Sequence, residues 1–503
     1  MRERAVIYAR GFGLANLEYD VPITPRTVFH VASVSKQFTA MAIALLADAG
    51  RLALDDDLHQ YVPELHDFGR PITIRQLLHH TSGLRDQWDL LVLAGWRMDD
   101  VITTADVLDL LAAQRELNFE PGAEYLYCNS GYTLLGVIVE RVSGQSLRQF
   151  AQERFFGPLG MADTHFHDDH TELVKNRAYS YEPKPGGGYR HMVLSYATVG
   201  ASSLFTTVED LARWDDNFYS GMVGGPAVLQ QMQTRGRLTS GDRLTYALGL
   251  SVSSYRGLPV VEHSGGDAGF RSHLLRFPEQ QFSVAVLSNL STARPGHLAR
   301  RVADALLEQA FPLPAQSASA DGPRPAERDL QDYAGLYYSR RRNETQRLEW
   351  RDGRLHWAVG PGVELIPAAG ESFQAPDSPS LEIRFVRGEA GQVRELQLAE
   401  AGMAATPYAR VTPAALSPEA LQEYAGTYYS PELDVTYRIE LDQSGLGLSR
   451  RKYACVPLEP TVPDGFVGNG VDYLFERDGA QAVCGFRLTT GRVRNLSFVR
   501  EPR

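Results

Sequence analysis

The stretch S-V-S-K-Q-F-T-A-M-A-I-A-L-L, residues 33–46, sets a serine and a lysine three positions apart at the start of a helix with an apolar stripe. Positions i and i+3 share one helical face, so the amine of Lys36 can lie against the hydroxyl of Ser33 and take its proton. The amino end of a helix also favours the negative charge that develops on the serine oxygen. This S-x-x-K pair predicts a nucleophile with its base, against the alternative of an N-cap serine beside a surface lysine.

Other short motifs differ in how well their surroundings support them. A second S-x-x-K match, residues 449–452, lies in a β-rich region where no helix fixes the spacing. Tyr127-Cys128-Asn129 is the only Y-x-N and stands in a turn ahead of a predicted helix, where side chains can point into a cleft. His263-Ser264-Gly265 is the only H-x-G, and the glycines there, with Gly266 next, let a substrate lie against the backbone and an amide point at an oxyanion. The order S-x-x-K, Y-x-N, H-x-G is hard to obtain by chance.

Residues 165–170, H-F-H-D-D-H, suggest a different chemistry, because they fit the H-x-H-x-D-H pattern of binuclear zinc hydrolases. Histidine nitrogens and aspartate oxygens both suit zinc. A Gly/Pro turn leads into the segment instead of an apolar strand, and no later histidine stands with a second ligand at ligand spacing. The sequence therefore predicts a solvated acidic loop without a metal, and it predicts no cofactor.

The three motifs together resemble those of the serine β-lactamases and penicillin-binding proteins, whose signatures are S-x-x-K, a Tyr or Ser motif ending in Asn, and K-[ST]-G. The likeness is greatest to the D-aminopeptidase and esterase branch, and residues 79–86, residues 119–132 and the β-rich carboxyl-terminal part add to it. The resemblance implies an α+β protein. Its catalytic domain would be β-lactamase/transpeptidase-like, with an antiparallel sheet between helical layers, and two lipocalin-like barrels would follow.

The same resemblance implies a role for each motif. Ser33 would be the nucleophile of an acyl-enzyme, and Lys36 and Tyr127 would share general acid/base work. Asn129 would orient the substrate, and the amides of Ser33 and Gly266 would form the oxyanion hole.

Three departures from the family pattern limit what can be carried over. K-[ST]-G is absent, and His263 in its place would anchor a substrate carboxylate poorly at neutral pH. The segment 459–472 is short where D-aminopeptidases carry a long loop into the active site. Its carboxylates Asp464 and Asp472 could still meet a substrate ammonium, or the segment could be an ordinary barrel hairpin. The helix and strand that open family members are missing, so either the start is truncated or the sheet lacks an edge strand.

The chain changes character near residue 312. Residues 1–312 mix short strands with amphipathic helices, expected at Ser35 to Ala49, Thr104 to Gln114, Ser130 to Val142 and Pro295 to Phe311. A Pro/Ala/Ser linker, 313–329, follows. L-Q-D-Y-A-G-L-Y-Y-S at residue 330 then returns as L-Q-E-Y-A-G-T-Y-Y-S at residue 421, which predicts two matched modules, 330–412 and 419–503. Alternating apolar residues and turns predict a small closed β-barrel for each.

Composition bounds the partners. The formal charge of −11 over 503 residues disfavours nucleic acid or an anionic membrane, and no apolar run is long enough to span a bilayer. Three cysteines imply no disulfide framework, although Cys455 could pair with Cys484. The sequence predicts a soluble protein, cytoplasmic as it stands and periplasmic or secreted with a longer amino terminus, and it leaves a homodimer open.

These observations favour a serine hydrolase that acts on D-aminoacyl amides or peptides, a small-molecule or peptide substrate. A carboxylesterase of the same fold is the first alternative and a weak β-lactamase the second. A different class, a catalytically silent relative that binds cell-wall peptides or a partner, has no need to retain Ser33, Lys36 and Tyr127 together.

Overall fold

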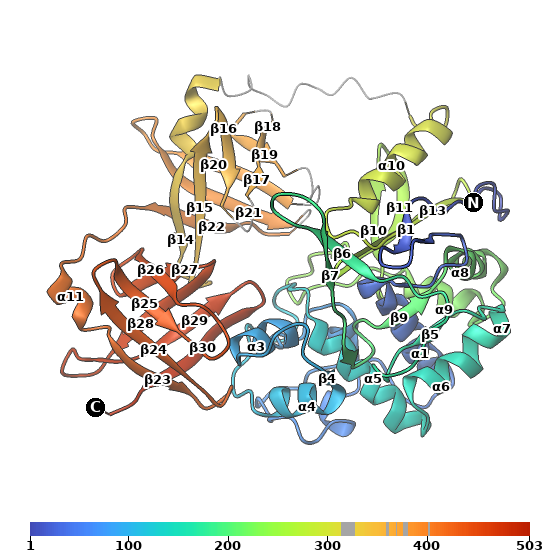
Figure 1. Cartoon of the computed structure of the whole chain (residues 1–503), viewed down its shortest axis with the longest axis horizontal. Coiled ribbons are helices and arrows are strands. Elements are labelled where there is room, and N and C mark those ends of the chain that lie inside the picture. The colour runs from blue at the N-terminus through green and yellow to red at the C-terminus, as the bar shows by residue number, and fades with distance from the viewer. Residues whose placement is uncertain (313–326, 359–361, 369, 376–380, 401–402, 503) are drawn as a thin grey trace. The chain divides into compact units, whose positions relative to one another are not determined.

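A computed structural model describes residues 1–312, 327–358, 362–368, 370–375, 381–400 and 403–502 (Figure 1). The chain divides into two compact units, and each is described by itself. The first, unit 1, comprises Met1–Gln87, Arg97–Ala112 and Phe119–Pro314. The second, unit 2, comprises Trp88–Trp96, Ala113–Asn118 and Ala315–Arg503. Most of the predicted linker, 313–326, lies outside the described residues, so the domain boundaries drawn from sequence stay predictions.

The sheet of unit 1 has four antiparallel strands in the order β10 (Ser251–Tyr255), β11 (Leu258–Asp267), β12 (Phe270–Phe277) and β13 (Phe282–Ser288). Helix α10 (Pro295–Leu306) packs on one face of the sheet around Leu275, Phe277 and Ala299. The turn η1 (Ala32–Ser35) packs on β11 and β12. The antiparallel sheet between helical layers is therefore confirmed. Among the described residues β13 has no strand on its outer side.

Helix α1 (Lys36–Asp48) is the centre of the helical layer. It follows η1 directly, and its residues 40–44, Ala40, Met41, Ala42, Ile43 and Ala44, are fully buried. A helix that is apolar nearly all round needs neighbours on every side. Helices α5 (Asn129–Ser143), α6 (Leu147–Ala151) and α9 (Gly225–Met232) supply them. The core of unit 1 thus closes around the segment that begins with Lys36.

All four helices expected from sequence are present, each ending within a few residues of the predicted bounds, α4 at Thr104–Ala112 and α10 at Pro295–Leu306 among them. The remaining helices of unit 1 are η2 (Leu58–Gln60), α2 (Ile74–Leu78), the π-helical turn η3 (Gln152–Phe156), α7 (Gly157–Leu159) and α8 (Val208–Ser220). Its short strands are β1 (Leu14–Asn16), β2 (Val21–Pro22), β3 (Phe29–His30), β4 (Ile102–Thr103), β5 (His165–Phe166), β6 (Ser180–Pro183), β7 (Tyr189–Met192), β8 (Tyr196–Ala197) and β9 (Leu204–Thr206). Within the described chain, no helix is both long and apolar enough to cross a membrane.

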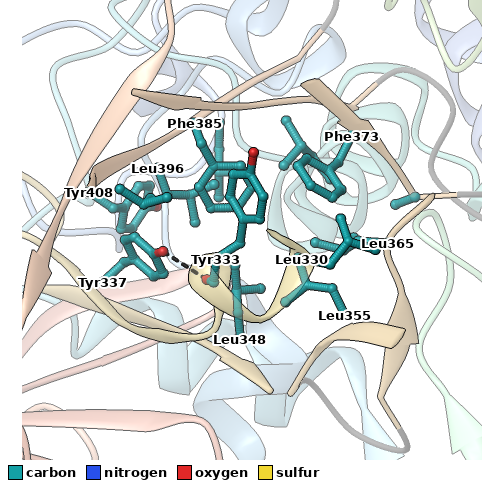
Figure 2. Packing of buried hydrophobic residues seen from close by; sticks show 14 residues of the cluster. Leu330, Tyr333, Tyr337, Leu348, Leu355, Leu365, Phe373, Phe385, Leu396 and Tyr408 are labelled. Carbon is teal, nitrogen blue, oxygen red and sulfur yellow. Dashed lines mark hydrogen bonds between the residues drawn. The ribbon is translucent and has the colours of Figure 1, made fainter. Parts of the chain in front are cut away.

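The first repeated module of unit 2 is a nine-stranded antiparallel sheet that nearly closes on itself. Tyr333 and Tyr337 fill its interior, and the Tyr337 hydroxyl donates to the carbonyl of Tyr333 at 2.8 Å (Figure 2). The order of its strands is β17 (Val363–Glu364), β16 (Arg354–Trp357), β15 (Glu344–Arg351), β14 (Gly335–Ser339), β22 (Thr406–Val411), β21 (Val393–Glu400), β20 (Leu381–Arg387), β19 (Ser372–Gln374) and β18 (Ile366–Pro367), and η4 (Glu327–Tyr333) precedes them. Unlike the predicted barrel, this sheet keeps two ends among the described residues.

The second module is a closed eight-stranded barrel, as predicted. The Tyr428 hydroxyl donates to the carbonyl of Tyr424 at 2.7 Å, the same bond that Tyr337 makes in the first module. The repeated Y-A-G-x-Y-Y sequence is therefore a structural element of each module. The elements are α11 (Pro418–Gln422), β23 (Gly426–Ser430), β24 (Val435–Asp442), β25 (Gly445–Ser449), β26 (Val456–Pro460), β27 (Gly465–Gly468), β28 (Val471–Arg477), β29 (Val483–Thr490) and β30 (Val493–Arg500).

Two short segments from the first third of the chain belong to unit 2. The Tyr437 hydroxyl donates to the carbonyl of Leu93, in α3 (Gln87–Leu93), at 2.7 Å. The side chain of Asn118 accepts from the amide of Arg494 at 2.7 Å. These contacts join residues far apart in the sequence, so the sequence pattern could not predict them. All three cysteines are free thiols, which leaves Cys455 and Cys484 unpaired.

A buried ion pair fixes helix α8 against the sheet, and it gives a stability prediction. Arg276 Nε donates to Asp215 Oδ1 at 2.6 Å, and both side chains are at most 3% exposed. Removing one partner leaves an uncompensated buried charge, so Asp215→Ala should lower the free energy of unfolding by about 3–5 kcal/mol in urea titrations. The double variant Asp215→Leu/Arg276→Met, which buries no charge, should recover most of this loss. A single variant as stable as the wild type would contradict the assignment.

Candidate active site

Ser33 lies in the tight turn η1, between β3 and α1, and it is partly exposed. The residue before it, Ala32, has a φ of +48°, a left-handed conformation that is strained for a residue with a side chain. Two side chains hold the turn: Ser35 Oγ donates to the carbonyl of Ala32 at 2.5 Å, and Ser272 Oγ donates to that of Val31 at 2.7 Å. The turn presents Ser33 at the start of the helix, as predicted for a nucleophile.

The amine of Lys36 is buried and in contact with the Ser33 hydroxyl. Its Nζ lies 3.0 Å from Ser33 Oγ, 2.8 Å from Asn129 Oδ1 and 2.7 Å from the carbonyl oxygen of Ala201. It also lies 4.9 Å from the centre of the Tyr127 ring. The structure thus brings together Ser33, Lys36, Tyr127 and Asn129, which come from two motifs more than ninety residues apart.

A carboxylate that the motifs did not reveal fixes the orientation of Asn129. Asp86 is fully buried, and its Oδ2 accepts from the backbone amide of Asn129 at 2.6 Å and from Asn129 Nδ2 at 2.8 Å. Because a carboxylate accepts only, the amide nitrogen of Asn129 must face Asp86 and its oxygen must face Lys36. The sequence offered no signal for this role beyond the position of Asp86 at the end of the H-H-T-S-G-L-R-D string.

A histidine from the same string holds the Y-x-N turn. His80 Nδ1 accepts from the amide of Cys128 at 3.0 Å, and its ring lies 4.1 Å from that of Tyr127. His80 itself has a left-handed backbone, with φ at +58°. Strained residues of this kind persist where the surrounding structure over-determines them. Tyr127 is therefore set in place by packing that short motifs do not record.

His263 is buried on β11 between two polar contacts. Its Nδ1 lies 2.7 Å from the carbonyl oxygen of Ser264, so this nitrogen carries the proton, and its Nε2 accepts from the Tyr246 hydroxyl at 2.9 Å. Burial, and then the charge of Lys36, lower the pKa of His263 to about 3. The histidine is therefore neutral at physiological pH and supplies no cation where K-[ST]-G would.

The glycines after His263 let β11 approach the turn that carries Ser33. A Cβ on Gly265 would lie 2.3 Å from the carbonyl oxygen of Val31, closer than any side chain allows. Gly266 is exposed. Strand β10 pairs with β11 only as far as Glu262, so along residues 263–267 β12 is the only strand paired with β11 in the described part of the chain. In the described chain, this stretch of β11 thus keeps one edge without a strand partner, near the turn that carries Ser33.

The two carboxylates predicted to bind an ammonium belong to unit 2 and have partners there. Asp464 Oδ1 accepts from the Tyr424 hydroxyl at 2.8 Å and from Arg477 Nε at 2.9 Å. Asp472 is buried and accepts from the amide of Thr345 at 3.0 Å, and burial raises its pKa to about 7. Contact between these residues and a substrate stays a prediction.

The histidine-rich segment is only partly the solvated loop expected from sequence. His165 lies in strand β5, which pairs with β9, and His167 is buried, so the loop prediction is wrong for this half. His165 Nε2 lies 3.4 Å from His167 Nδ1, which lies 3.6 Å from a carboxylate oxygen of Glu172. Arg148 donates to both oxygens of Glu172, at 2.6 and 2.7 Å. A guanidinium thus already neutralises the carboxylate that a metal would use.

Burial of His263 predicts a loss of stability in acid. Its folded pKa of about 3 lies below the ordinary value of 6.5, so the unfolded chain binds the proton more tightly. The stabilising contribution is whole above pH 6.5 and is lost as the pH falls towards 3, by up to about 1.4 kcal/mol per pH unit. Urea unfolding at pH 7.5, 6 and 5 should show a smaller acid-induced loss for His263→Gln than for the wild type. Parallel losses would contradict the prediction.

Comparison with known proteins places this geometry in a family. A family model described as Beta-lactamase matches residues 1–309. Penicillin-binding protein 4* of Bacillus subtilis (strain 168) is 27% identical over 403 residues, which span 76% of this chain and 88% of that protein. The D-aminopeptidase of Gluconobacter oxydans (strain 621H) is 27% identical over 306 residues, which span 61% of this chain and 58% of that protein.

Solved structures share the fold. The octameric penicillin-binding protein homologue from Pyrococcus abyssi has a TM-score of 0.57 at 24% sequence identity, over 81% of this chain and 94% of that one. The penicillin-binding protein from Bacillus halodurans has a TM-score of 0.52 at 25% identity, over 59% of this chain and 90% of that one. Because the family model covers well over half of the sequence, the chain belongs to the Beta-lactamase family, as the resemblance of its three motifs predicted.

Proposed function

We propose that this protein is a serine hydrolase that forms an acyl-enzyme on Ser33 and cleaves D-aminoacyl amides or peptides. The observation that carries the proposal is the contact of 3.0 Å between Lys36 Nζ and Ser33 Oγ, made by a buried amine with two further acceptors. The similarity to D-aminopeptidases, at 27% identity, supports the substrate class.

The acceptors around Lys36 explain how it would act as a base. Asn129 Oδ1 and the carbonyl oxygen of Ala201 can only accept, so each takes an N–H from the amine. When the amine is neutral, its two N–H groups point to these acceptors and its lone pair points towards Ser33. Lys36 then removes the hydroxyl proton as Ser33 Oγ bonds to the substrate carbonyl carbon. The amides of Ser33 and Gly266 stabilise the oxyanion.

The second half of the reaction needs a proton for the leaving amine and then a water molecule. Tyr127, whose ring lies beside Lys36, passes the proton to the leaving nitrogen as the carbon–nitrogen bond breaks. Water then attacks the carbonyl carbon of the ester on Ser33. Its proton passes through the same groups to Ser33 Oγ as the bond between that oxygen and the acyl carbon breaks, and the acid is released. Asn129 orients the substrate.

The neutral His263 bears on the substrate class. A substrate with a carboxylate beside the scissile bond, such as a β-lactam or a D,D-dipeptide end, would find no permanent cation at the H-x-G position. Amides and esters that extend on their acyl side need no cation at this position. A carboxylesterase is the second candidate, and the engagement of Asp464 and Asp472 inside unit 2 favours it.

A substrate panel separates the two candidates. Rates for p-nitroanilides of D- and L-amino acids are compared with rates for p-nitrophenyl esters of graded length. Hydrolysis of D-aminoacyl anilides above the L series supports the proposal, and hydrolysis of esters alone supports the carboxylesterase.

Ser33→Ala should abolish hydrolysis of every substrate and leave the fold intact, because the hydroxyl forms the covalent bond. Lys36→Ala and Tyr127→Phe should each lower kcat by a factor on the order of 10² to 10⁴, the usual cost of a lost proton transfer. Ser449→Ala, in the second S-x-x-K match, is the control and should behave as wild type. Full activity of Ser33→Ala would refute the mechanism. Loss of activity in Ser449→Ala would refute it as well.

Hydrolysis should survive exhaustive chelation, because the proposed chemistry uses only side chains and water. Activity is measured after dialysis against EDTA, and again after zinc is added. His165→Ala, which removes one imidazole from the group formed by His165, His167 and Glu172, should keep wild-type rates. Loss of activity on chelation and recovery with zinc would show that a metal is part of the reaction.

A further inference from the structure

One carboxylate of unit 1 stands at the end of the strand that carries the oxyanion amide. Asp267 is the last residue of β11, directly after Gly266. The turn that follows is tight, since Phe270 pairs back with Asp267 and Ala268 has a left-handed φ of +44°. The side chain of Asp267 is 15% exposed. A short, fixed turn therefore presents a partly open carboxylate beside the candidate oxyanion hole.

The contacts of Asp267 hold it in place without neutralising it by a permanent cation. Its Oδ2 accepts from Ser202 Oγ at 3.1 Å and lies 3.3 Å from His30 Nε2. Among the described residues, neither lysine nor arginine forms an ion pair with it. Arg271 is close enough to sense its charge, but Nη1 of Arg271 donates to backbone carbonyls at 2.7 and 3.0 Å. A carboxylate accepts about four hydrogen bonds, so Asp267 can accept one more beside those from Ser202, His30 and Tyr196.

The loop that anchors Asp267 also positions the base. Ser202 follows Ala201, whose carbonyl oxygen accepts from Lys36. On the other side, the Tyr196 hydroxyl hydrogen-bonds to Asp267, and burial, then the charge of Asp267 and this hydrogen bond, raise the pKa of the tyrosine. The negative charge is thus part of the same group of residues as the nucleophile and its base.

The direction of β11 decides which part of a substrate meets Asp267. The proton-handling groups lie at its His263 end, where Tyr246 contacts His263 and the Tyr127 ring lies 6.3 Å away. The leaving group must depart towards them. The oxyanion amide of Gly266 lies three residues further, about 10 Å along the strand. The acyl part of the substrate therefore extends past Gly266 towards Asp267.

The chemistry of an aminoacyl group fits this position. Its α-ammonium sits on the carbon next to the reacting carbonyl, and so it comes within reach of a carboxylate one residue beyond the oxyanion amide. A charge-assisted hydrogen bond between the two is short and strong. Asp464 and Asp472, the carboxylates predicted from sequence, are held by partners within unit 2 instead.

We propose that Asp267 binds the α-ammonium group of the substrate and selects substrates with a free amino terminus over N-acylated ones. The inference rests on the proposed function, because it assigns a substrate group to the site of Ser33.

The test compares three substrates in the wild type and in Asp267→Asn: a D-aminoacyl p-nitroanilide, its N-acetyl derivative, and a p-nitrophenyl ester of a simple fatty acid. Asparagine keeps the shape of the side chain and removes the charge. We expect kcat/KM for the free amine to fall about 10- to 100-fold, mainly through KM, while the ester changes little. Asp109→Asn, an exposed carboxylate on α4, is the matched control and should match the wild type.

The possible outcomes distinguish a failure of this inference from a failure of the proposed function. If Asp267→Asn slows all substrates equally, or none, Asp267 does not bind the ammonium and the inference is overturned. If Asp464→Asn, and not Asp267→Asn, removes the preference for the free amine, the inference is again overturned. If the wild type hydrolyses only the ester, the proposed D-aminoacyl function itself fails. Labelling of Ser33 by a fluorophosphonate in Asp267→Asn confirms that the variant is folded and its nucleophile active.

Discussion

The site depends on one buried amine and the three oxygens around it. Lys36 Nζ can serve Ser33 as a base only if its other contacts are fixed acceptors, and Asn129 Oδ1 and the carbonyl of Ala201 meet this condition. Burying an amine without partners would be costly, so the acceptors are needed for stability as well as for chemistry. They come from α5 and from the loop before β9. The packing of α1 against α5 therefore sets the geometry around Ser33, the proposed nucleophile.

Residues further from the amine orient the side chains that surround it. Asp86 turns the amide of Asn129, and His80 holds the turn that carries Tyr127. On the opposite side, glycine at position 265 allows β11 to approach the carbonyl of Val31. Left-handed backbone at Ala32 and His80 occurs in the same region. Such conformations cost free energy, and here they lie directly before Ser33, the proposed nucleophile, and in the residue that supports the Y-x-N turn.

The sequence predicted the part of the site that local geometry determines. An i, i+3 pair at a helix start must lie on one face, so Ser33 and Lys36 could be joined from spacing alone. The four helices followed from apolar periodicity and the two modules from the repeat. The roles of Asp86, His80 and Tyr246 could not be predicted, because their contacts bridge segments far apart in the chain. His165 was misplaced in a loop because the two-residue strand β5 is too short to show alternation. Closure of each module depends on pairing of its terminal strands, which composition does not encode.

Electrostatics then distinguishes the two ends of residues 263–267 of β11. At the His263 end, burial and the charge that Lys36 carries when protonated keep the imidazole neutral, so a protonated Lys36 has no second cation beside it. Two buried cations side by side would repel each other and oppose folding. At the Asp267 end, a carboxylate is held by Ser202 and His30, and among the described residues it forms no ion pair with a lysine or arginine. A ligand with a positive charge on its acyl side, and no charge beside the scissile bond, matches this distribution. A ligand with a carboxylate beside the scissile bond would find no cation at His263, and Asp267 would repel that carboxylate.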